Sequence, residues 1–199
     1  MNTREDKFSS SMVQTPPSGI RKFFEMLIGH DDVISLSVGE PDFPTPWCIR
    51  EEAFYHLEKG HTSYTSNWGL LELREEISKY MQKYNMHYNP QKEILITVGA
   101  SEGVDASLRA ILNPGDEIIV CQPCYVNYVP LARLCEVNVV PIDTSVNGFY
   151  PTAEQIEKAV TPKTKAVMIC SPNNPTGTMI PKDELEKIAE IVKKHQLWV

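Results

Sequence analysis

The sequence predicts an α/β fold, with a doubly wound, mostly parallel sheet and helices on both of its faces. From residue 93 onward, apolar strand-like runs alternate with helical patterns, and this alternation is typical of parallel strands joined by helices. The strand-like runs are almost continuously apolar, as in strands that are covered on both faces. With 42% hydrophobic and 23% charged residues among 199, the chain is long enough for one substantial core.

The first third of the chain predicts an arm followed by helices. After a polar start, the segment 20–27 places its apolar residues at helical spacing and predicts a short helix. A β-rich run at 33–38 enters a loop of Gly, Pro and Asp, and a helical pattern at 48–60 ends at Gly60. The segment 70–84 is an amphipathic helix by its spacing, with Leu70, Leu73, Ile77 and Met81 on one face.

The alternating part of the chain gives the sheet and its covering helices. Strands are predicted at Glu93–Val98, Glu117–Cys121, Val137–Ile142, Lys165–Cys170 and Leu197–Val199. Helices are predicted between them, at 101–112, 125–135, 152–160 and 182–195. We therefore divide the chain into an arm with a short helix at 1–31 and one α/β domain at 32–199.

Net charge and hydropathy indicate which partners and which cellular compartment to expect. The net charge is -7 and no cluster of Lys and Arg stands out, which argues against nucleic acid as a partner. No apolar run is long enough to cross a bilayer, and the polar start MNTREDKFSS lacks the apolar core of a secretory signal. We expect a cytoplasmic protein without a membrane partner.

Cysteine spacing favours packing over chemistry. The five cysteines form an odd, irregularly spaced set, and several of them lie in or beside apolar runs. This pattern fits reduced thiols. The pair in CQPC, Cys121 and Cys124, has the spacing of a redox or zinc motif, but no second pair or histidine lies nearby. We expect packing for these thiols and no metal site.

A candidate anion site lies in TVGASEG, where a predicted strand meets a helix. Gly99 allows a close backbone approach, and the N–H groups near Ala100 and Ser101 point outward at the positive end of the helix dipole. The alternative is that Gly99 shapes a turn and Ser101 only caps the helix. This motif alone favours neither interpretation, because it lacks the fuller pattern of nucleotide-binding loops.

Polar and aromatic side chains follow two further strand ends. Tyr125, in PCYVNY, has a ring that could stack on a flat heteroaromatic ligand, and Asn174, in SPNNPTGT, offers an amide between two prolines. Tyr64 offers a phenolic hydroxyl to an anion, although packing is the commoner role for either tyrosine. Carboxyl ends of parallel strands meet at one sheet edge, so we expect Ser101, Tyr125 and Asn174 to share a site.

These stretches together resemble a known family. VGEPDFPTP, TSYTSNWGLLELR, TVGASEG, LNPGDEIIVCQPCYVNY and SPNNPTGTMIPKDEL occur in this order, and the chain from about Ile20 onward resembles the class I/II aminotransferases. These are pyridoxal-phosphate enzymes of fold type I. The resemblance implies the large domain of that fold, incomplete here, with an N-terminal arm and part of the small domain.

The resemblance also implies roles for single residues. Gly99, Ala100 and Ser101 match the cradle of the cofactor phosphate, Tyr125 matches the ring that stacks on pyridoxal, and Asn174 matches the donor to its O3′ oxygen. Gly39 matches a backbone contact with the substrate carboxylate. Tyr64 matches a tyrosine that reaches the phosphate in the neighbouring subunit, which implies a homodimer.

The family's catalytic groups have no match in the sequence. By the resemblance, the lysine that forms the Schiff base and the aspartate at the ring nitrogen lie beyond Val199. Because the chain stops inside an apolar run, we interpret it as the N-terminal half of a longer protein and expect it to be inactive alone. The implied activity is amino-group transfer between an L-amino acid and a 2-oxo acid. The alternatives are a C–S β-lyase that uses the same cofactor, and a non-catalytic cofactor-binding or dimerisation fragment.

Overall fold

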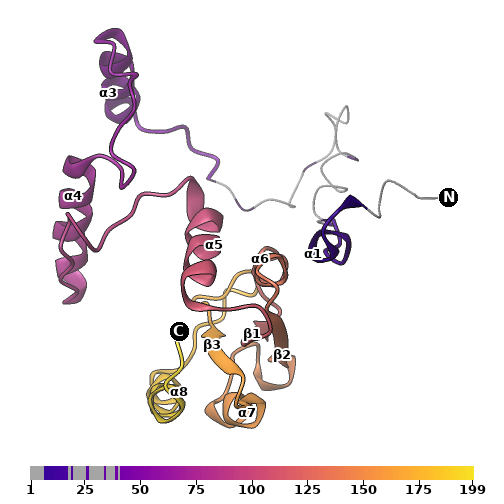
Figure 1. Cartoon of the computed structure of the whole chain (residues 1–199). Helices are drawn as coiled ribbons and strands as arrows, with labels where there is room; N and C mark the ends of the chain where they lie inside the picture. The colour runs from indigo at the N-terminus through magenta and orange to yellow at the C-terminus, as the bar shows by residue number, and fades with distance from the viewer. Residues whose placement is uncertain (1–6, 18, 20–25, 27–33, 35–38, 40) are drawn as a thin grey trace. The chain divides into compact units, whose positions relative to one another are not determined.

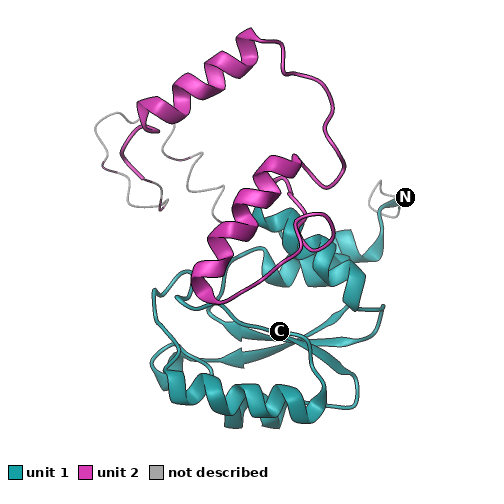
Figure 2. Cartoon of the chain, turned by 90° about the vertical axis from the view of Figure 1, so that its left-hand side faces the viewer, with its two compact units in different colours: residues 1–18, 99–199 teal, residues 19–98 magenta. Residues whose placement is uncertain are grey.

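A computed structural model describes residues 7–17, 19, 26, 34, 39 and 41–199. The chain forms two compact units, 1–18 with 99–199 and 19–98, which Figure 2 shows in different colours. Each unit is described here by itself. The short helix predicted at 20–27 and the β-rich run predicted at 33–38 lie outside the described residues, apart from single positions.

The first unit has alternating helices and strands after a short N-terminal helix, α1 (Ser10–Val13). In chain order its elements are α5 (Gly99–Ile111), β1 (Glu117–Gln122), α6 (Tyr128–Leu134), β2 (Asn138–Asp143), η3 (Ser145–Asn147), α7 (Ala153–Ala159), β3 (Thr164–Met168) and α8 (Lys182–His195) (Figure 1). The predicted strands that became β1, β2 and β3 are confirmed to within two residues.

The three strands form a parallel sheet in the order β2-β1-β3. The chain end adds a beginning of a fourth strand: Trp198 bridges to Ala166 in parallel, through a bond of 2.9 Å from its N–H to the Lys165 carbonyl. The strand predicted at Leu197–Val199 is therefore present only as a single bridge at Trp198. Pro141 lies in β2, at a described edge of the sheet, where a residue without an N–H is tolerated.

The strand predicted at Glu93–Val98 is wrong. This segment has no regular structure and belongs to the second unit. A strand needs a neighbour that accepts and donates along its length, whereas the Ile96 N–H donates to the carbonyl of Trp68, 3.1 Å away, in a loop. The apolar pattern of the segment was compatible with a strand, but it does not determine a partner.

Helices cover both faces of the sheet, as a doubly wound fold requires (Figure 1). Successive β1 residues point to opposite faces. Ile118 and Val120 pack with the buried residues of α5 and α6, and Ile119 packs with those of α7 and α8. All three side chains are at most 1% exposed, so the two cores meet at the central strand and explain its continuous apolar run.

The ends of α8 follow from local sequence. Pro181 precedes the first turn, where Asp183 and Glu184 face the positive end of the helix dipole, and three basic residues occupy the last turn. Gln196 ends the helix in the left-handed conformation, with φ 54°. The predicted helix 182–195 is confirmed over its whole length.

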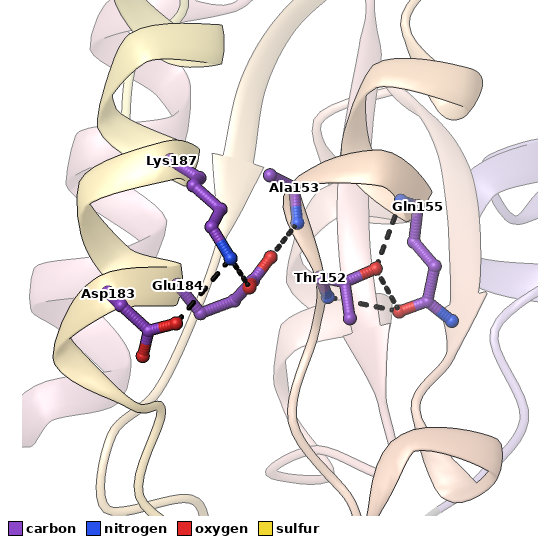
Figure 3. Close-up of polar contacts among 6 residues, drawn as sticks. All are labelled: Thr152, Ala153, Gln155, Asp183, Glu184 and Lys187. Atoms are coloured by element: carbon purple, nitrogen blue, oxygen red, sulfur yellow. Dashed lines mark hydrogen bonds and ion pairs between the residues drawn. The ribbon is translucent and has the colours of Figure 1, made fainter.

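Polar contacts join α7 to α8 (Figure 3). Thr152 and Gln155 form a capping box, in which the Gln155 N–H donates to the Thr152 hydroxyl and Gln155 Oε1 accepts from the Thr152 N–H. The buried Ala153 N–H donates instead to Glu184 Oε1 of α8, at 2.7 Å, and Lys187 Nζ lies 3.0 Å from the second carboxylate oxygen. The start of α7 is thus completed by a side chain from another helix.

The second unit contains α3 (Trp47–Glu58), α4 (Leu71–Met81) and the 3-10 turn η2 (Gln82–Tyr84). The apolar face of α4 is only partly covered, since Leu73 is exposed, and its buried residues are Arg74 and Ser78. The Arg74 guanidinium donates to the Pro90 carbonyl, and the Ser78 hydroxyl donates to the Tyr88 carbonyl at 2.6 Å. These two hydrogen bonds hold the following loop against α4, although the buried Arg74 Nε has no partner among the described residues.

Candidate functional site

The candidate site lies where β1, β3 and the start of α5 meet at the carboxyl end of the sheet. The structure brings Ser101 of α5 and Tyr125 of the loop after β1 to the same side chain. Asn127 Nδ2 donates to Ser101 Oγ at 3.0 Å and to Tyr125 Oη at 3.2 Å. Two of the residues expected to share a site are therefore linked by a third residue that the sequence analysis did not select.

The start of α5 has the form expected of an anion site. Gly99 has φ +80°, a backbone conformation that suits glycine, and open space surrounds the position where a Cβ would stand. This conformation turns the chain into the first helical turn, and a place for Gly99 in the phosphate cradle stays a prediction. Ala100 is exposed and Ser101 is half-buried on that turn, which lies at the positive end of the helix dipole, where negative charge is favoured.

Tyr125 presents a partly buried aromatic ring beside this helix start. Its ring packs edge-on against Tyr128, with centroids 5.6 Å apart and planes at 78°. Edge-on packing is a favoured arrangement of two aromatic rings, so Tyr128 helps to hold the Tyr125 ring in place. The helix predicted at 125–135 begins only at Tyr128, so Tyr125 lies in the loop.

The loop 171–178 is held by its first asparagine. Asn173 Nδ2 donates to the Pro123 carbonyl of the loop after β1, at 3.1 Å, and to the Thr176 hydroxyl at 2.8 Å. Asn174 is exposed, and its amide is presented outward by a loop that its neighbour anchors. Asn174 was predicted from the sequence and Asn173 was not, because adjacent asparagines give no sign of which one points inward.

Three cysteines line a small cavity under these two loops. Cys121, Cys124 and Cys170 surround about 10 Å³, roughly the room for one water molecule. Burial raises the pKa of the Cys121 thiol to about 12, and Cys124 adds to the shift. Burial, followed by the neighbouring Cys170, also raises the pKa of Cys124. Thiols that stay protonated are poor nucleophiles and metal ligands, and all five cysteines are free.

Tyr64 and Gly39 belong to the second unit, whereas Ser101, Tyr125 and Asn127 belong to the first. The Tyr64 side chain is fully exposed, and nothing lies within 4 Å of a Cβ placed on Gly39. Their expected roles stay predictions.

The side chains of the site suit an anionic, flat ligand. Ser101 adds a hydroxyl to the N–H groups of the helix start and Tyr125 adds a ring, whereas the amide of Asn174 stays a predicted donor. Among the described residues, no group of three His, Cys, Asp or Glu side chains is placed to hold a metal ion. None of the described helices combines the length and the apolar character needed to span a bilayer.

Comparisons of the sequence with known proteins identify its family. Residues 31–199 match the family model for aminotransferase class I and II. The chain is 50% identical over 193 residues to a putative aminotransferase, YugH, of Bacillus subtilis, covering 96% of this chain and 50% of the relative. It is 45% identical to a probable N-acetyl-LL-diaminopimelate aminotransferase of the same organism, covering 92% of this chain and 47% of the relative.

Solved structures give the same result. An aspartate aminotransferase from Thermus thermophilus with maleate superposes with a TM-score of 0.88 at 35% identity, covering 96% of this chain and 51% of that chain. The chain thus spans about half the length of the relatives that it matches. From the family match and the site together, the chain belongs to the class I and II aminotransferases, the family that its sequence resembles.

Proposed function

We propose that the protein containing this chain is a pyridoxal-phosphate-dependent aminotransferase, which moves an amino group between an L-amino acid and a 2-oxo acid. The observation that carries the proposal is the linkage of Ser101 to Tyr125 through Asn127 at the start of α5. It puts an anion-binding hydroxyl and an aromatic ring at one place, within a chain of the aminotransferase family.

The residues present fit the cofactor. The N–H groups of the first α5 turn and the Ser101 hydroxyl would hold its phosphate, since both donate to an anion at the positive end of a helix. Tyr125 would cover one face of the ring and exclude water from it. The exposed Asn174 amide would donate to the ring oxygen. When bound, the cofactor supplies the electron sink for amino transfer.

We also propose the compartment, the oligomeric state and the domain division of the protein. We place the protein in the cytoplasm as a homodimer, with residues 1–31 as an arm and 32–199 as the family's domain, truncated on its C-terminal side. Tyr64 reaches the partner's cofactor, and Gly39 contacts the substrate carboxylate. The relatives' names include aspartate and N-acetyl-LL-diaminopimelate, so the proposal goes no further than the class of L-amino acids.

The test is a product assay on the natural protein that contains this chain, with added cofactor. Formation of a 2-oxo acid from an L-amino acid, with amination of a 2-oxo acid acceptor, is expected. Release of a thiol and pyruvate from a cysteine conjugate would indicate a β-lyase instead. The chain 1–199 alone should show neither activity.

Replacing Ser101 by alanine tests the phosphate cradle. A hydrogen bond to a charged group contributes about 1.5–3 kcal/mol, so S101A should weaken cofactor affinity about 10- to 150-fold. The turnover number at saturating cofactor should change much less, because the lost bond is ground-state binding. Equal cofactor affinity in S101A and the parent would remove Ser101 from the cradle.

A further inference from the structure

Asn127 occupies the position that begins α6, but its side chain does not do what that position usually requires. Its carbonyl accepts from the Leu131 N–H at 3.0 Å, which starts the helix, yet its side chain makes no capping bond to α6. Asparagine is favoured at this position because its side-chain oxygen accepts from the helix N–H groups. Here the amide nitrogen is committed to Ser101 and Tyr125 instead.

The direction of these two bonds has a chemical consequence. An amide NH₂ group only donates, so Ser101 Oγ and Tyr125 Oη both act as acceptors toward Asn127. Each hydroxyl then has its own hydrogen left to donate elsewhere. If the amide were reversed, its oxygen would accept from both hydroxyls and neither hydrogen would be available to an anion.

We propose that Asn127 is a positioning residue, which orients the Ser101 and Tyr125 hydroxyls as donors toward the phosphate group of the ligand. The inference rests on the proposed function, because it names the residue that prepares that same site. Asn127 does not touch the reacting atoms. It acts through two hydroxyls, and the part-buried setting of both bonds keeps them from exchanging freely with water.

The test compares pyridoxal phosphate with pyridoxal, which has the same ring without the phosphate. Equilibrium dialysis of the natural apoprotein gives both dissociation constants, and their ratio is the phosphate advantage. In N127D the carboxylate accepts from both hydroxyls and also repels the phosphate, so the advantage should fall by about tenfold or more, with pyridoxal affinity little changed. N127A adds no charge and should lower the advantage less, which gives a second measurement if N127D does not fold.

The matched control is Asn138, whose exposed side-chain amide donates to the Gly115 carbonyl in the same unit. N138A should leave the phosphate advantage unchanged. A double-mutant cycle tests whether Asn127 acts through Ser101. N127A should then lower the phosphate advantage less in an S101A background than in the parent protein.

The outcomes separate the inference from the proposed function. If the parent protein binds both probes equally, the phosphate site itself is wrong and the inference falls with it. If the parent shows the advantage and the Asn127 variants retain it, only the inference is overturned. Equal weakening of both probes would show a structural role for Asn127 and would also overturn it.

Discussion

Replacing Glu184 tests whether a side chain of α8 completes the start of α7. Glu184 Oε1 accepts from the buried Ala153 N–H at 2.7 Å, and the Glu184 side chain is only 14% exposed (Figure 3). In E184A this N–H loses its acceptor. A buried donor left unsatisfied costs about 1–3 kcal/mol, and the lost charge near the α7 helix start adds about 0.3–1 kcal/mol. We expect a loss near 2 kcal/mol in the free energy of unfolding.

The assay is urea unfolding of the chain, followed by circular dichroism. With a slope of about 2 kcal/mol per molar, the midpoint should fall by roughly 1 M in E184A. The matched control is E186A on the same helix, because Glu186 is exposed and lies 3.8 Å from Lys182. Exposed pairs of this kind contribute about 0–1 kcal/mol. Equal losses in E184A and E186A would refute the reasoning.

Unfolding at low pH distinguishes the stability that comes from the charge of Glu184 from the stability that comes from its hydrogen bond. The Ala153 N–H, followed by Lys187, lowers the pKa of the Glu184 carboxyl below its ordinary value. A lowered pKa in the folded state stabilises the fold above the unfolded value, about 4.3, and that contribution is lost as the pH falls through the folded value. E184Q keeps an acceptor without the charge, so its deficit at pH 7 should shrink as the pH falls through the lowered pKa of Glu184, whereas that of E184A should persist.

Two further predictions concern the core and the thiols. Ile119 of β1 is 0% exposed and packs with residues of α7 and α8, so I119A should lower the free energy of unfolding by about 2–5 kcal/mol. V146A, at an exposed position, should change it by no more than about 0.5 kcal/mol in the same urea titration. Equal midpoints for the two variants would contradict the packing. With a thiol-reactive dye at pH 8, the exposed Cys48 should react at once and Cys121, whose pKa burial raises to about 12, only on unfolding. In the unfolded chain the Cys121 thiol ionises at about pH 8.5, below its pKa in the folded chain, so the free energy of unfolding should fall as the pH rises above that value. Prompt labelling of Cys121 in the folded chain would disprove its burial.

Local sequence determined the elements of the first unit and their layering. The unbroken apolar run of β1 predicted cover on both faces, and Ile118 and Ile119 do face opposite cores. The apolar spacing of residues 182–195 predicted α8, and the charges at its two ends agree with its observed limits. These features follow from interactions within a few residues or from the alternation of a strand, so the sequence carries them directly. The joint motifs also predicted the family, which the comparisons confirm.

Tertiary structure alone decided the contacts that complete the site. Asn127 lies 26 residues from Ser101 along the chain, and Asn173 lies 50 residues from Pro123. The side chain of an asparagine at a helix start predicts a cap by every local rule, so its use as a donor to two hydroxyls depends on what packing brings near it. The segment 93–98 likewise depends on tertiary structure, because an apolar run becomes a strand only where a neighbouring strand is present to pair with it.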